Sequence, residues 1–226
     1  MGGRTVSATR SATTNGAVSI DVVLLAVREQ RLHVLAQPTD ATRKRFALPW
    51  GEPSRGERLD ASAARIAKAA AGARVDWLEQ AGAFGDGTMH PGSTVVSVCY
   101  LGVRPWIDVS SPWSWIDVHS SHPFAERQRQ MLAAALDLSR TRLEQAPLAF
   151  SLLPRSFTLA ELQQAYETVL GRKLHKASFR RALQAAFLVD PTGEWRGEGR
   201  GRPAQLYRYA PRKHKGSRRG VRLDLL

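Results

Sequence analysis

Apolar residues in the first third of the chain follow two different spacings. Residues 18–27 form a nearly continuous run rich in valine, isoleucine and leucine, which favours a buried strand. A polar turn and a second apolar run at 32–35 predict a hairpin. The alanine-rich stretch 60–71 predicts a helix with Asp60 as its N-cap residue and Gly72 just beyond its end.

The alternation of strands and helices continues to about residue 145. Strands are predicted at 80–85 and 95–102, and apolar residues at helical spacing predict a helix over 124–143. The stretch that begins at Asp117 is interpreted as mobile. Strands alternating with helices indicate an α/β or α+β fold.

A different pattern follows the segment 145–147. Thr158 and Glu161 have the spacing of a capping box, and Gly171 marks the end of the helix that they begin. The predicted elements that follow are a second helix and two short strands, at 176–187, 188–190 and 206–209. Helix, turn, helix and hairpin in this order predict a winged helix.

The formal charge is 33 − 20 = +13, and it is unevenly distributed. Residues 151–226 hold 16 Lys and Arg against 6 Asp and Glu, whereas residues 1–150 hold 17 against 14. An excess of this size predicts an anionic partner, and its concentration in the last third assigns that partner to the winged helix. The tails at 1–16 and 213–226 are expected to be disordered and basic respectively.

Two further features suggest a cytoplasmic, nucleoid-associated protein with no membrane partner. The single cysteine, Cys99, excludes an intrachain disulfide and lies in an apolar run, where a buried thiol is expected. No stretch is long and apolar enough to predict a transmembrane helix, and residues 1–16 lack the apolar core of a secretory signal.

The second helix of a helix-turn-helix lies in the major groove of DNA. Helical spacing turns Ser178, Arg181 and Gln184 outward, and Arg181 and Gln184 are expected to make paired contacts with base edges. The residues expected to contact phosphates and the minor groove are Lys173, Lys176, Arg180, and, at the wing tip, Arg200 and Arg202. The alternatives are a solvated face without a partner and a membrane surface.

The first region resembles a known family. Gly51, Glu57, Arg65 and Gly72 fall at the spacing of the Nudix box, Gly-x5-Glu-x7-Arg with a later glycine. Together with residues 78–86, 149–154 and 199–209, this pattern makes residues 17–212 resemble the Nudix-related transcriptional regulators, the NrtR family.

The resemblance implies an α+β chain, with a Nudix-fold α/β/α sandwich at 17–145 that binds an effector and a winged helix at 146–212 that binds operator DNA. It also implies bacterial origin and a homodimer. A repressor is expected, and activation stays open from the sequence. The implied effector is a nucleotide or sugar derivative such as ADP-ribose, and the implied genes serve NAD metabolism.

The chain departs from the Nudix box at the positions that bind the catalytic metal in hydrolases. Nudix hydrolases hold Mg²⁺ through glutamates on one helix face, and the matching positions here are Ile66, Ala69 and Ala70. We therefore expect no catalysis, no metal and no cofactor. Glu57 is expected to be a surface or loop-anchoring acid, and Arg65 a structural partner of Glu57 or of the loop backbone. The candidate effector-binding residues are Trp50, Glu57, Arg65 and Phe84.

Three functions remain open from the sequence. The first is a ligand-responsive repressor. The second is an active Nudix hydrolase with an accessory nucleic-acid module, and the third is a DNA-binding protein whose Nudix-like region only dimerises. Binding of ADP-ribose separates the first from the third, and product release with Mg²⁺ tests the second.

Overall fold

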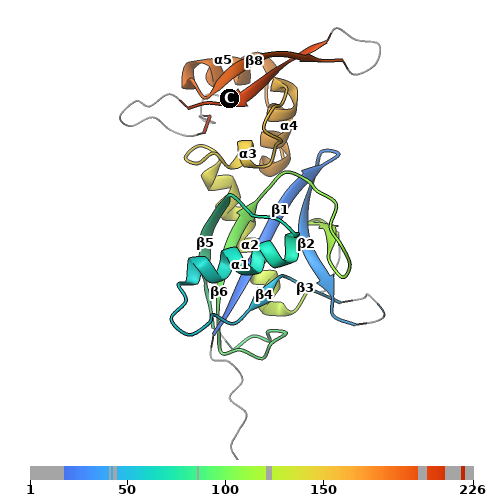
Figure 1. The fold of residues 1–226 in the computed structure, drawn as a ribbon, viewed down its shortest axis with the longest axis vertical. Helices are drawn as coiled ribbons and strands as arrows, with labels where there is room; N and C mark the ends of the chain where they lie inside the picture. The colour runs from blue at the N-terminus through green and yellow to red at the C-terminus, as the bar shows by residue number, and fades with distance from the viewer. Residues whose placement is uncertain are drawn as a thin grey trace, which may run out of the picture.

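The computed structural model describes residues 18–40, 42, 45–85, 87–120, 124–197, 203–211 and 220–221. The predicted tail at 1–16, most of the basic tail at 213–226, and both wing-tip residues, Arg200 and Arg202, lie outside these described residues. The structure has two parts, and the smaller C-terminal part sits at one end of the sheet of the larger (Figure 1).

A mixed sheet forms the larger part. Its path runs β3-β2-β1-β6-β5, with β4 paired to β1 and β7 paired to β2. The strands are β1 (Val18–Arg28), β2 (Arg31–Pro38), β3 (Phe46–Ala47), β4 (Trp50–Gly51), β5 (Trp77–Phe84), β6 (Val96–Val103) and β7 (Ser114–Asp117). The pair β1 and β6 is parallel, and the other pairs in this sheet are antiparallel.

Two helices cover opposite faces of this sheet, α1 (Leu59–Ala71) and α2 (Glu126–Arg142). Alternate residues of β1 explain the arrangement, because successive side chains of a strand point to opposite faces. Ile20, Val22 and Leu24 pack with α1, whereas Val23 and Leu25 pack in the cluster that contains Met131 of α2. The larger part is therefore the expected α/β/α sandwich.

Several local predictions for this region are confirmed. The β1–β2 hairpin turns at Glu29 and Gln30, whose φ angles of 49° and 62° suit a two-residue turn with left-handed backbone. Gly72 ends α1 with a φ of 69°. Cys99 is fully buried, and burial raises the pKa of its thiol.

Other local predictions are wrong. The helix α1 begins one residue before Asp60, and its N-cap residue is Arg58, which makes no side-chain cap. Asp60 instead accepts hydrogen bonds from Arg58, with Oδ1 3.0 Å from Nε. No strand is predicted at 114–117, where β7 pairs with β2, and the mobility of the stretch that begins at Asp117 stays a prediction. The helix α2 begins at Glu126 rather than at Phe124.

The smaller part consists of α3 (Leu148–Ser151), α4 (Leu159–Leu170), α5 (Lys176–Ala186) and the hairpin of β8 (Val189–Arg196) and β9 (Ala204–Tyr209). The capping box of Thr158 and Glu161 is formed, and Gly171 ends α4 with a φ of 70°. The short α3 was not predicted, and β8 continues six residues beyond the predicted end at Asp190. The order of elements is that of a winged helix.

The two parts share one continuous apolar core at their junction. Leu143, just after α2, and Tyr166 of α4 are both fully buried, and the Tyr166 hydroxyl donates to Leu143 O at 3.3 Å. The same hydroxyl accepts from the backbone N–H of Val221 at 3.0 Å. None of the described helices is long and apolar enough to cross a membrane.

Candidate functional sites

The outer face of α5 carries a group of exposed cationic and polar side chains. Phe179 and Leu183 are buried at 0% and 1% exposure, so they fix which side of the helix faces the core. Exposed on the other sides are Lys176, Arg180, Arg181 and Gln184, and Ser178 is half-buried. The helix therefore presents the side chains that its periodicity predicts, and their contacts with DNA remain a prediction.

Two of the predicted DNA-contacting residues already have partners within the protein. The Nζ atom of Lys173 lies 3.0 Å from Glu167 Oε2. The Ser178 hydroxyl lies 3.2 Å from Nδ1 of His175, the residue before α5. To bind a phosphate, Lys173 would have to give up its ion pair with Glu167. The cations of α5, by contrast, are already exposed to a partner.

The wing is attached to the start of α4 by an ion pair. Arg196, at the end of β8, places its Nη1 and Nη2 atoms 3.0 and 2.7 Å from the two carboxylate oxygens of Glu161. A bidentate pair of this kind fixes orientation as well as distance. The base of the wing is therefore held beside the helix that precedes α5.

Arg65 contacts both of the partners expected for it, the Glu57 carboxylate and the loop backbone. Arg65 donates from Nε and Nη2 to the Glu57 carboxylate at 2.9 and 2.7 Å, and also from Nη2 to Glu52 O at 3.1 Å. The Arg65 guanidinium and the Ser54 N–H hold the pKa of Glu57 well below its usual range. These bonds anchor the loop before α1, as expected.

The metal-binding positions of the Nudix box carry no oxygen donors. Ile66 and Ala70 are buried against the sheet, and Ala69 is exposed. A hard cation such as Mg²⁺ takes oxygen ligands, so these residues do not fit it. Among the residues that the structure describes, no three His, Cys, Asp or Glu side chains gather where they could hold a metal ion.

A cleft of about 430 Å³ lies beside this face of α1. Its lining combines the end of the helix with the loop before β7, namely Ala69, Ala70, Ala71, Gly72 and residues 107–113. The candidate residues Trp50, Glu57, Arg65 and Phe84 do not line it. The cleft was not foreseen, because nothing local in residues 107–113 indicates that they fold back on α1.

The candidate effector-binding residues occupy separate surroundings. Trp50 packs edge-on against His90, with ring centroids 5.0 Å apart, and its ring fills the space that a Cβ at Gly92 would need. Phe84 packs against the core on the α2 side of the sheet. The contacts that the structure describes join Glu57 to Arg65 and place Trp50 and Phe84 elsewhere.

A buried polar network that the sequence did not indicate lies between β1 and α2. Asp21 is fully buried, and its Oδ1 accepts from Gln128 Nε2 at 2.9 Å and lies 2.9 Å from His90 Nε2. The backbone N–H of Gly92 donates to His90 Nδ1 at 3.0 Å. The Nε2 atom therefore carries the proton and donates to Asp21.

Arg127 supplies the buried positive charge of the same region. It is 3% exposed and donates to Thr94 O at 2.7 Å and to Thr88 O at 2.6 Å. The network thus ties α2 and the 88–94 loop to β1. The only signal in the sequence was a lone aspartate within an apolar run, which does not identify its partners.

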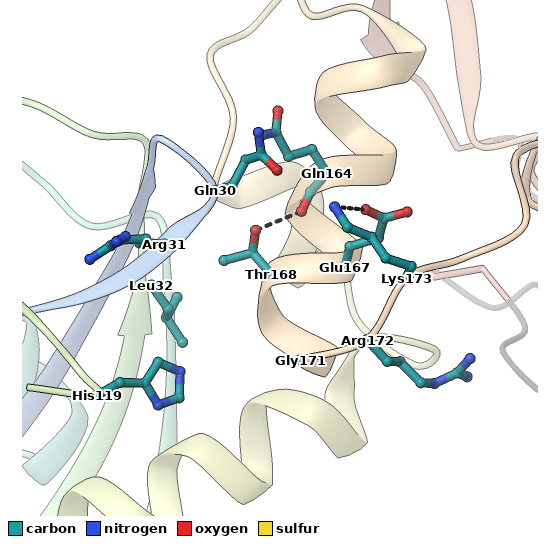
Figure 2. A pocket seen from close by; sticks show the side chains of 10 residues that line it. All are labelled: Gln30, Arg31, Leu32, His119, Gln164, Glu167, Thr168, Gly171, Arg172 and Lys173. Carbon is teal, nitrogen blue, oxygen red and sulfur yellow. Dashed lines mark hydrogen bonds and ion pairs between the residues drawn. The ribbon is translucent and has the colours of Figure 1, made fainter.

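Two cavities lie between the two parts of the chain. The first, of about 390 Å³, separates the β1–β2 turn from the end of α4. Figure 2 shows Gln30 and Leu32 facing α4 across it, with Lys173 paired to Glu167. Arg31, the cation that β2 contributes to the lining, is also paired, 3.1 Å from Asp117. The second cavity, of about 600 Å³, lies between the sheet and α3.

Comparison with known proteins identifies the smaller part. Residues 149–209 match the model of the NrtR DNA-binding winged helix domain. Over 205 residues the chain is 29% identical to the ADPR responsive transcriptional repressor NtrR of Acinetobacter baylyi, covering 85% of this chain and 82% of that protein.

Solved structures extend the likeness to both parts. The crystal structure of Shewanella oneidensis NrtR complexed with a 27mer DNA matches with a TM-score of 0.77 and 26% identity, over 86% of this chain and 94% of that one. A MutT/nudix family protein from Enterococcus faecalis shares the fold, with a TM-score of 0.66 and 19% identity over 92% and 90% of the two chains. The smaller part thus matches the DNA-binding domain of the NrtR family, and the chain as a whole is similar to NrtR proteins, the Nudix-related transcriptional regulators.

Proposed function

We propose that this protein is a ligand-responsive transcriptional repressor that binds operator DNA as a homodimer in the bacterial cytoplasm. The observation that carries the proposal is the exposed face of α5, where Lys176, Arg180, Arg181 and Gln184 project from a helix whose opposite side is buried. Arginine and glutamine can each make paired hydrogen bonds with a base edge in the major groove, and lysine can neutralise phosphates.

The proposed effector is ADP-ribose or a related nucleotide or sugar derivative. The Acinetobacter relative is described as ADPR responsive, which makes ADP-ribose the first ligand to test. We assign its site to the α1 cleft, where Ala69 and Ala70 stand at positions that hold metal-binding glutamates in hydrolases. The cleft's lining has a single carboxylate, Asp108, and one carboxylate does not hold Mg²⁺ against a diphosphate, so the ligand is bound and not cleaved.

Coupling between the two sites runs through the junction. The α2 helix is tied to the sheet, where Arg142 Nε lies 2.7 Å from Glu79 Oε1, and its end contacts α4 through Leu143 and Tyr166. A movement of α2 would therefore shift α4 and the α5 helix that follows it. In a dimer such a shift changes the distance between two recognition helices that must match two half-sites.

The test is fluorescence anisotropy with the full chain and a labelled operator. We expect ADP-ribose to weaken the complex by roughly 5–150-fold, the range of a typical coupling energy. Calorimetry on the same samples should show reciprocal weakening of ADP-ribose binding by DNA, because the coupling is symmetric. Chromatography after incubation with Mg²⁺ should recover ADP-ribose intact. Turnover at about 1 s⁻¹ or faster would instead show a working hydrolase.

A further inference from the structure

The cavity of about 600 Å³ between the two parts of the chain has the composition of a ligand site. The larger part lines it with Arg74, Asp76, Trp77 and 103–105, and the smaller part lines it with Pro147, Phe150, Ser151, 153–155, Phe157 and Tyr209. It shares no lining residue with the α1 cleft. Its size lies within the range of roughly 300–1,000 Å³ usual for small-molecule sites, which often form between domains.

Arg104 lies in this cavity as a buried charge. It is 7% exposed, and its hydrogen bonds are long, from Nε to Pro105 O at 3.3 Å and from Nη1 to Ala71 O at 3.4 Å. It forms no ion pair with any carboxylate in the described part of the chain. Burial lowers the pKa of its guanidinium, although Asp76 acts in the opposite direction. A buried cation without a counter-ion favours an anion beside it.

A second cation stands at the mouth of the same cavity. Arg155, in the loop between α3 and α4, is exposed. Arg74, across the cavity, already forms an ion pair with Asp76, with its Nε atom 3.6 Å from Oδ1. Two guanidiniums, Arg104 within and Arg155 at the rim, therefore remain to meet a ligand. Guanidiniums bind phosphate and carboxylate groups through paired hydrogen bonds.

The lining also holds four aromatic side chains, of which Trp77 and Tyr209 are half-buried, whereas Phe150 and Phe157 are 6% and 1% exposed. Phe150 and Tyr209 lie with ring centroids 4.4 Å apart at an interplanar angle of 32°, and Phe157 adjoins Phe150 at 5.9 Å. Trp77 of β5 is half-buried on the opposite side. The half-buried rings of Trp77 and Tyr209 suit a flat ring, which gains free energy by stacking on aromatic side chains.

We propose that this interdomain cavity binds a small anion that carries a flat aromatic ring, of the class of a nucleoside monophosphate. The phosphate lies between Arg104 and Arg155, and the ring lies against the aromatic lining. The site is separate from the α1 cleft and goes beyond the proposed function. A ligand there contacts both parts of the chain at once and stabilises one arrangement of the winged helix relative to the sheet.

The test is calorimetric titration of the DNA-free full chain with AMP, adenosine and inorganic phosphate. We expect AMP to bind more tightly than either fragment. Arg155→Ala should weaken AMP by about tenfold, as the loss of one charge-assisted hydrogen bond implies. Arg104→Met should abolish AMP binding. Arg104 also contacts the end of α1, so thermal melting must first show that the Arg104→Met variant folds. Arg155 lies in an exposed loop, so Arg155→Ala tests the proposal even if Arg104→Met does not fold.

Arg181→Ala is the matched control, since it removes an exposed arginine from the DNA-binding helix and should leave AMP binding unchanged. The proposal is overturned if AMP and adenosine bind equally, if Arg181→Ala weakens AMP as much as Arg155→Ala does, or if AMP does not bind at about 1 mM. Absence of AMP binding would leave operator binding and its response to ADP-ribose intact, so the two proposals fail separately.

Discussion

The two parts of the chain place their charges in opposite ways. Between β1 and α2 one group of charged and ionisable side chains is inside, with Asp21, His90 and Arg127 at 0%, 4% and 3% exposure. On α5 the inside is apolar, and Lys176, Arg180 and Arg181 are exposed. Charge in this protein therefore serves two purposes. The buried charges of the larger part hold its elements together, and the exposed charges of α5 remain available to a partner.

The physical reason is the cost of burying charge. A buried ion needs compensating partners, so removal of one group leaves the others unsatisfied and destabilises the fold. Exposed cations are solvated and contribute little to stability, but they act on a polyanion. The two regions should therefore respond in opposite ways to the same kind of substitution.

The largest effect is expected from Arg127→Met. Removing the buried guanidinium takes away the donor that binds the Thr88 and Thr94 carbonyls and the Ser97 hydroxyl. We expect the free energy of unfolding to fall by about 3–5 kcal/mol, as measured by urea denaturation. Arg129→Met, at an exposed position of the same helix, is the control and should change stability by less than about 0.5 kcal/mol. Equal effects of the two variants would contradict a structural role for the buried network.

Arg181→Ala should give the opposite result. Stability should change by less than about 0.5 kcal/mol, because the side chain is exposed. Operator binding should lose about 1–3 kcal/mol, and the preference at one or two base pairs should relax. Anisotropy with the operator and with single-base variants measures both. An unchanged sequence preference would assign Arg181 to phosphate contact instead.

A flexible Gly/Ser segment inserted after Gln145 tests whether the two regions communicate through their junction. The structure connects the end of α2 to α4 through Leu143 and Tyr166, so a long linker should uncouple them. We expect ADP-ribose to bind as before, while its effect on the operator, about 1–3 kcal/mol, disappears. Calorimetry and anisotropy on the same preparation separate these outcomes. A full response in this variant would refute transmission by α2.

The smallest effect is expected from Lys176→Ala. This side chain is assigned to a phosphate, so its loss should weaken all duplexes alike. The slope of log affinity against log salt concentration should decrease by about one, and the ranking of sequences should not change. Titrations at several salt concentrations with operator and unrelated DNA provide the measurement. A change in ranking would place Lys176 at a base edge.

Local signals allowed much of this fold to be predicted. The apolar run of β1, the capping box at Thr158 and the glycines at the ends of α1 and α4 each act within a few residues. The exposed face of α5 followed from helical spacing alone. By contrast, Asp21 finds His90 and Gln128 at separations of 69 and 107 residues, which no local pattern reveals. The cavities between the two parts depend on how the helices and strands pack together, so they could not be predicted from the sequence either.

The Glu161 carboxylate has a consequence for how the sequences of relatives can vary. It accepts from the backbone N–H of Thr158 at 2.7 Å and also pairs with Arg196 of the wing. A capping box works with either glutamate or glutamine, but only glutamate also neutralises an arginine. Substitutions at positions 161 and 196 should therefore occur together across the family, with glutamine at the first tolerated only where the arginine at the second has been replaced.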